Sequence, residues 1–217
     1  MSASKFKKKN IRFFSNFEFV MSQVHQCYLL MLDDFTSIPN NEVEIHKRLY
    51  KDYLENDNIL SKLGLKEYFF DYEVPQINEN YKIKGRTDIK VYHNKDRENE
   101  RNAFYIIELK RLDGGKHLNK EYIKEGIQRF TLGKYPSFLS LFGMIGFVVK
   151  EIDIDKNVKK INTLLETDYS KPETVKYLQN DNFTNCSYQS EHKDSRDNNL
   201  KAFHQFWDFN EKINLNK

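Results

Sequence analysis

The sequence contains two strand-like segments in close succession, Ile83-Lys84-Gly85-Arg86-Thr87-Asp88-Ile89-Lys90-Val91 and Ala103-Phe104-Tyr105-Ile106-Ile107-Glu108-Leu109-Lys110. Side chains two positions apart on a strand point to the same face of a sheet. Asp88 is therefore the one acid on the basic face of the first segment, and Glu108 and Lys110 share a face where the second segment ends. The polar stretch 93–102 is typical of an exposed hairpin connection, which would bring Asp88 and Glu108 together.

Such a pair of carboxylates predicts a bound cation. Two neighbouring carboxylates repel each other unless a cation or a proton lies between them. Hard divalent cations prefer carboxylate oxygens and keep several waters, so Mg²⁺ is the cofactor that Asp88 and Glu108 indicate, and we expect Mn²⁺ to substitute for it. Lys110 adds positive charge beside this site without filling it. A metal there would polarise a phosphate and activate a bound water, which favours phosphodiester hydrolysis.

Helical spacing and strand alternation continue on both sides of these segments. Helices are predicted at about 11–35, 41–55, 119–132 and 158–165, and strands at about 67–74, 81–92, 103–111, 144–149, 183–190 and 200–209. From residue 41 to residue 150 the predicted order is a helix, three strands, a helix and a strand. The predicted class is therefore mixed α/β.

The motif Gly85-Arg86-Thr87-Asp88, followed by Glu108-Leu109-Lys110, resembles the core motif of the PD-(D/E)XK nuclease superfamily. This resemblance implies a restriction-endonuclease-like core, α-β-β-β-α-β, with a mixed central sheet flanked by helices, over residues 41–150. An N-terminal helical extension (1–36) and a C-terminal extension of strands and a helix (151–217) would belong to the same single domain. By the same resemblance, Asp88, Glu108 and the backbone carbonyl of Leu109 bind the metal, and Lys110 positions the attacking water.

The resemblance implies two further site residues. The superfamily often has a glutamate on its first core helix, and Glu42 fits that position as a further acid near the metal. Glu44 competes with it, but Glu42 shares the apolar helix face with Ile45 and Leu49. A RecB-like branch of the superfamily carries a glutamine on the helix after the lysine strand, where Gln128 stands.

The net charge does not by itself indicate a nucleic-acid partner. The chain has 35 basic and 32 acidic residues, which leaves a formal charge of +3. Local basic residues near the motif could contact phosphates, although a solvated charged surface explains them equally well. These candidates are Arg86, Arg111, Lys116, Lys120, Arg129 and Lys134. DNA is the substrate that the family resemblance implies.

The whole chain of 217 residues fits one cytoplasmic domain. Asn16 and Glu18 interrupt the apolar stretch after the basic N-terminus, so neither an export signal nor a membrane span is expected. The two cysteines, Cys27 and Cys186, have no metal-ligand spacing.

The expected role is bacterial or phage restriction, antiviral defence or DNA processing. The chain lacks a nucleotide-binding P-loop, so a helicase or ATPase subunit would have to drive any unwinding. A regulatory subunit or a homodimer could restrain the nuclease. The alternatives are a catalytically silent nucleic-acid-binding or scaffold domain of the same fold, a nuclease acting on RNA, and a metal-dependent hydrolase of small phosphate esters.

Overall fold

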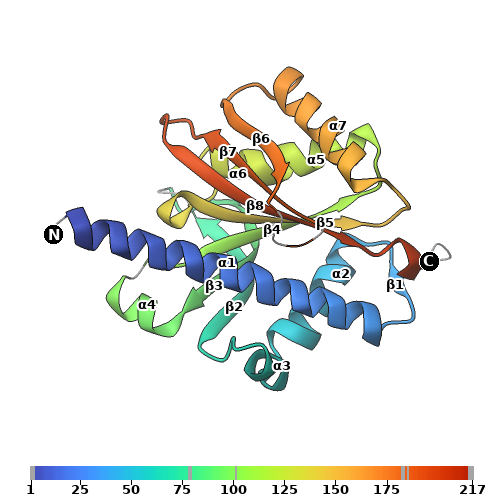
Figure 1. The fold of residues 1–217 in the computed structure, drawn as a ribbon, viewed down its shortest axis with the longest axis horizontal. Coiled ribbons are helices and arrows are strands. Elements are labelled where there is room, and N and C mark those ends of the chain that lie inside the picture. Colours follow the sequence, from blue (N-terminus) through green and yellow to red (C-terminus); the bar gives the residue numbers. More distant parts are fainter. Residues whose placement is uncertain (1–2, 78–79, 101, 182–183, 185, 215–217) are drawn as a thin grey trace.

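A seven-stranded mixed sheet, of order β2-β3-β4-β5-β8-β7-β6, forms the centre of the protein (Figure 1). The computed structural model describes residues 3–77, 80–100, 102–181, 184 and 186–214. The strands are β2 (Tyr68–Ile77), β3 (Ile83–His93), β4 (Tyr105–Leu112), β5 (Leu141–Val148), β6 (Thr174–Asn180), β7 (Ser187–Lys193) and β8 (Asn199–Asp208). β5 pairs in parallel with β4 and with β8, and the other neighbouring strands are antiparallel. The mixed α/β class is thereby confirmed.

One face of the sheet is covered by the long helix α1 (Ala3–Asp34), which begins earlier than predicted. Its apolar residues, repeating at the helical spacing from which the helix was predicted, are buried from Phe13 to Tyr28 and pack in one cluster with Ile107 and Leu109 of β4. The same cluster includes residues of α2 (Glu42–Arg48) and of the π-helical turn Leu49–Leu54 that continues it. The short helix α3 (Asp57–Lys62) follows, and its Leu60 is buried in this cluster too.

The other face is covered by the helix predicted at 119–132 and by α7 (Ile154–Thr167). The first of these is divided into α5 (Lys116–Tyr122), a π-helical turn (Ile123–Ile127) and α6 (Gln128–Thr131). Tyr122 and Ile127 pack in a second cluster with Ile106 of β4. Because side chains alternate along β4, Glu108 and Lys110 lie on this second face.

One local prediction is wrong, and two strand features were not predicted. The connection 93–102 is not simply exposed, because it contains α4 (Asn94–Asn99) and because Asp96 is buried against Arg12 Nη2, at 2.6 Å. β6 was not predicted, and neither was the two-residue parallel pair of β1 (Ile38–Pro39) with β9 (Ile213–Asn214). The strand predicted at 183–190 is described only from Ser187, as β7, and Phe183 lies outside the described residues.

Within the described residues, no helix has both the length and the apolar character needed to cross a membrane.

Candidate functional site

The sheet is interrupted on both sides of Asp88. Pairing of β3 with β4 ends at Ile89 and Ile107, and by the same register Asp88 and Glu108 are the next facing residues. On the other side, the described pairs of β2 and β3 continue at Thr87 but skip Glu73, which has a φ of 46°. Residues other than glycine rarely adopt such a φ. Asp88 therefore occupies a local opening of the sheet rather than a regular ladder position.

The side chain of Asp88 takes part in the backbone bonding of β4. Its Oδ2 accepts a hydrogen bond from Leu109 N at 2.7 Å. Burial raises the pKa of Asp88, against the lowering effects of the Lys110 ammonium and of the Leu109 N–H. The side chain of Asp88 is 20% exposed, so it is less buried than that of Glu108.

Glu108 is the most buried of the acids, with a side chain that is 0% exposed. Its Oε1 accepts from Lys110 Nζ and from Arg129 Nη1, both at 3.2 Å, whereas no donor reaches its Oε2. Burial, followed by the charge of Asp88, raises the pKa of Glu108 well above its usual value despite these two cations. Burial therefore disfavours the charged form of Glu108 more than the two cations favour it.

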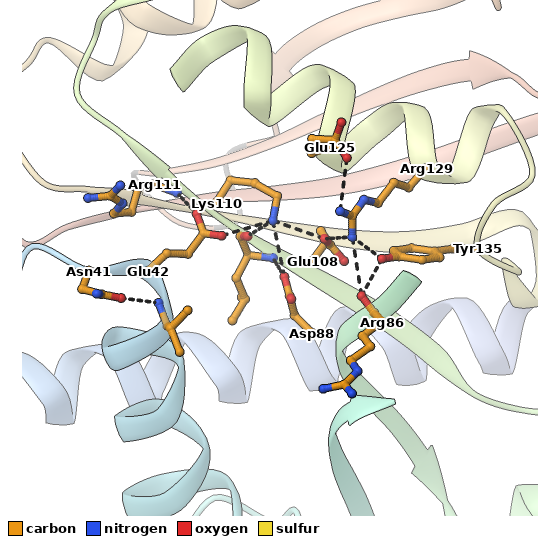
Figure 2. A network of polar contacts seen from close by, with 12 residues as sticks. Asn41, Glu42, Arg86, Asp88, Glu108, Lys110, Arg111, Glu125, Arg129 and Tyr135 are labelled. Atoms are coloured by element: carbon orange, nitrogen blue, oxygen red, sulfur yellow. Dashed lines mark hydrogen bonds and ion pairs between the residues drawn. The ribbon is translucent and has the colours of Figure 1, made fainter. Parts of the chain in front are cut away.

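Lys110 lies at the centre of this group of acids (Figure 2). Its Nζ donates to Leu109 O at 2.7 Å and lies 3.2 Å from Glu108 Oε1, 3.3 Å from Glu42 Oε1 and 3.8 Å from Asp88 Oδ2. Burial alone would lower the pKa of Lys110, but the three carboxylates raise it above its ordinary value. The amine is consequently an ammonium ion at neutral pH, and it can donate hydrogen bonds but cannot accept a proton.

Glu42 reaches this cluster from the first turn of α2. Asn41 caps the helix, and its Oδ1 accepts from Val43 N at 2.9 Å. Glu42 Oε2 accepts from Arg111 N at 2.8 Å, in addition to the contact of Oε1 with Lys110. Glu44 instead pairs with the neighbouring Lys47 on the exposed side of the helix. Of the two acids considered from the sequence, the structure brings Glu42 to the cluster.

Arg129, rather than Gln128, connects the second helical layer with Glu108. Gln128 Nε2 donates to Lys171 O at 3.5 Å, while Arg129 bonds both Glu108 and Glu125 (Figure 2). Neighbouring helix positions point in different directions, and the π-helical turn just before them shifts which position faces the sheet. Arg129 was predicted only as a phosphate contact, so its place in the cluster is a feature that the sequence did not indicate.

Tyr135 and Glu125 were not predicted as site residues. The Tyr135 hydroxyl accepts a short hydrogen bond from Arg129 Nη1 and donates one to Arg86 O. Glu125 Oε2 lies 3.2 Å from Arg129 Nη2. Arg129 and Tyr135 are six positions apart, and no local pattern in the sequence indicates their contact.

The remaining basic candidates lie around the cluster rather than in it. The Arg86 side chain pairs with Glu73 at 3.3 Å. The Arg111 side chain donates to Asn40. Asp168 Oδ2 lies 3.9 Å from Lys116 Nζ and 2.7 Å from Lys120 Nζ. Lys134 is exposed beside Tyr135 and lines a groove.

The oxygen atoms of the cluster suit a hard cation. No group of three or more His, Cys, Asp or Glu side chains among the described residues is arranged to hold a metal ion. Asp88, Glu108 and Glu42, the three acids predicted as ligands, are therefore not arranged as one ligand group. The remaining set comprises the two carboxylates Asp88 and Glu108 and the Leu109 carbonyl, which accepts from Lys110 Nζ. Glu108 Oε2 is buried without a donor, which is the state expected of a metal-ligating oxygen without its metal. The donor set therefore fits Mg²⁺ in its chemistry.

Comparisons with protein-family models, with curated proteins and with solved structures gave no match for this chain. The protein therefore has a mixed α/β fold in which Asp88, Glu108 and Glu42 surround Lys110 at an opening of the sheet. The geometry of this cluster is the observation that bears on function.

Proposed function

We propose that this protein is a Mg²⁺-dependent nuclease of the PD-(D/E)XK type that hydrolyses phosphodiester bonds in DNA. The observation that carries the proposal is the facing pair of Asp88 and Glu108 at the end of the β3–β4 ladder, with Lys110 between them. The order α2, β2, β3, β4, α5 with α6, and β5, with the short helices α3 before β2 and α4 between β3 and β4 as additions, is consistent with a restriction-endonuclease-like core. Such an enzyme would serve restriction, defence or DNA processing.

In this mechanism Asp88, Glu108 and the Leu109 carbonyl would hold the cation, with Glu42 as a further acid nearby. Mg²⁺ held there would supply positive charge for the phosphate and would lower the pKa of a coordinated water. Arg129 donates a hydrogen bond to Glu108 Oε1, and Glu108 Oε2, which accepts none, is the oxygen that would bind the cation. The Lys110 ammonium would orient the attacking water or stabilise charge on the phosphate by donating hydrogen bonds.

The test is a cleavage assay on labelled single-stranded DNA, duplex DNA and RNA, with Mg²⁺, with Mn²⁺ and with EDTA. The variants are Asp88→Asn, Glu108→Gln and Lys110→Met, and the matched control is Glu166→Gln, which changes an exposed acid on α7. We expect metal-dependent DNA cleavage by the wild type and by the control, and a loss of about a hundredfold or more in each of the three variants. Circular dichroism spectra verify that all variants are folded.

The outcomes separate this proposal from its alternatives. If the folded wild type cleaves none of the substrates, or if all three variants cleave as well as the control, the proposal is wrong. Binding of DNA without cleavage under any metal condition would favour a silent binding domain. Cleavage of RNA but not of DNA would identify RNA as the substrate.

A further inference from the structure

A groove with a volume of about 590 Å³ opens beside the candidate site. Three segments distant in sequence line it, namely the end of the β2–β3 hairpin, the segment 130–137 and the turn 194–196. Tyr135 is shared, because it lines the groove and also bonds Arg129 and Arg86 O in the polar network. The groove therefore adjoins the acid cluster.

The hairpin that forms one wall extends beyond the rest of the sheet. β3 pairs with β4 only from Ile89 to Val91, but it pairs with β2 as far as Ile83. On this two-stranded arm Lys84 and Arg86 are exposed. The pairing register shifts between Gln76 and Ile77, opposite Lys84, so simple alternation does not hold there, and of these two cations Lys84 lines the groove. The groove therefore has an exposed cation on the strand that carries Asp88.

The charge of the groove lining is positive. Lys84, Lys134 and Arg196 are exposed on it, and the side chain of Arg196 is 80% accessible even though it pairs with Asp194. Asp194 is the one acid of the lining and is buried, where its carboxylate accepts from the backbone N–H groups of Arg196 and Asn198. The surface presented to a ligand is therefore cationic, which suits phosphate groups.

Apolar side chains lie among these cations. Ile77 is 62% exposed and Leu132 is 46% exposed, and Pro136 is exposed beside them. A DNA duplex turns its bases inward, whereas a single strand offers both phosphates and apolar base faces to a protein. The combination of cations and exposed apolar groups therefore favours a single strand.

We infer that this groove binds a segment of single-stranded DNA and directs it to Asp88 and Glu108. The phosphates lie against Lys84, Lys134 and Arg196, and the bases contact Ile77, Leu132 and Pro136. This inference rests on the proposed nuclease function for its choice of ligand.

Binding is tested without catalysis, by fluorescence anisotropy in EDTA with a labelled oligothymidine of about twelve nucleotides. The groove variant is Lys84→Ala with Lys134→Ala and Arg196→Ala. The control variant, Lys62→Ala with Lys66→Ala and Lys150→Ala, removes as many exposed charges elsewhere on the surface. We expect the groove variant to bind about tenfold or more weakly than the control at about 0.1 M salt. Its log–log salt slope should be smaller by about 2, because each phosphate contact on a single strand contributes roughly 0.7.

A second variant, Ile77→Ser with Leu132→Ser, tests the apolar contacts at two exposed positions where the fold is not at risk. It should weaken binding of the single strand by a few fold and leave the weaker binding of a duplex of equal length unchanged. The inference is wrong if the wild type binds no single strand, if the groove and control variants bind equally, or if the duplex binds as tightly as the single strand. If the groove variant loses binding but the wild type cleaves no substrate, single-strand binding by the groove is supported and the proposed nuclease activity is contradicted.

Discussion

Leu109 N donates a hydrogen bond to Asp88 Oδ2, at 2.7 Å, at the point where the pairing of β3 with β4 has ended. The carbonyl of the same residue accepts from Lys110 Nζ. Both backbone groups of Leu109 are thus bonded by side chains of the candidate site. This arrangement ties the position of the acids to the backbone of the sheet, so changes at the site should be felt in stability as well as in activity.

Arg129→Met should lower the free energy of unfolding by about 2–4 kcal/mol, because it leaves the buried Glu108 with one fewer cation. The measurement is urea unfolding followed by circular dichroism. Lys134→Met is the control, since Lys134 is exposed, and its effect should stay within about 0.5 kcal/mol. Equal unfolding midpoints for Arg129→Met and the wild type would show that Arg129 does not stabilise Glu108.

Four buried histidines should make the stability depend on pH, and two of them, His192 and His204, lie side by side. Burial lowers the pKa of His192 to about 4 and, together with the nearby His192, lowers that of His204 well below 6.5. Ser190 Oγ lies 2.7 Å from Nε2 of each ring, so both are held as neutral rings within a buried hydrogen-bonded chain. The unfolded chain takes up these protons near pH 6.5, so the folded state loses stability as the pH falls from 6.5 towards 4.

The expected slope for each histidine is about 1.4 kcal/mol per pH unit, measured by urea unfolding at several pH values. His204→Asn should flatten the dependence by about that amount, whereas His117→Asn, at an exposed position of α5, should not. If the free energy of unfolding depends on pH with the same slope in His204→Asn as in the wild type, proton uptake by His204 on unfolding does not cause the dependence.

Gly146→Ala should destabilise the protein by about 1–3 kcal/mol. Gly146 is next to Lys110 in the parallel ladder, and a Cβ there would lie 2.6 Å from Leu112 Cδ1 and 2.8 Å from Phe206 Cδ1. Combination with Leu112→Ala relieves part of this overlap, so the two losses measured by urea unfolding should sum to more than the loss in the double variant. Strict additivity would contradict the steric account.

Alternation along the strands was sufficient to predict which side chains of β4 share a face. Ile107 and Leu109 pack under α1, and Glu108 and Lys110, which were predicted to share a face, lie on the other side with the second helical layer. This part of the cluster follows from local periodicity. Each face of β4 lies in one of the two hydrophobic clusters, so alternation alone fixes the face on which each side chain lies. The helical stripe of α1 was predictable for the same reason.

Other features depend on contacts that no local pattern encodes. Arg129 faces Glu108 because a π-helical turn precedes it, and Gly126 in that turn lies against the buried Met144. β6 carries only one buried residue, Leu178, so its alternation is too weak to predict a strand. Asp96 is buried because of an ion pair with Arg12, which is 84 positions away in the chain.

Cation binding by the purified protein tests the central claim most directly, because it requires no knowledge of the substrate. The measurement is isothermal titration of Mn²⁺ and Mg²⁺ into the wild type, Glu108→Gln and the control Glu166→Gln. We predict that the wild type and the control bind the cation alike and that Glu108→Gln, while folded, binds it at least about tenfold more weakly. Equal binding by Glu108→Gln and the wild type, or no binding by the wild type, would contradict a metal centre at Asp88 and Glu108.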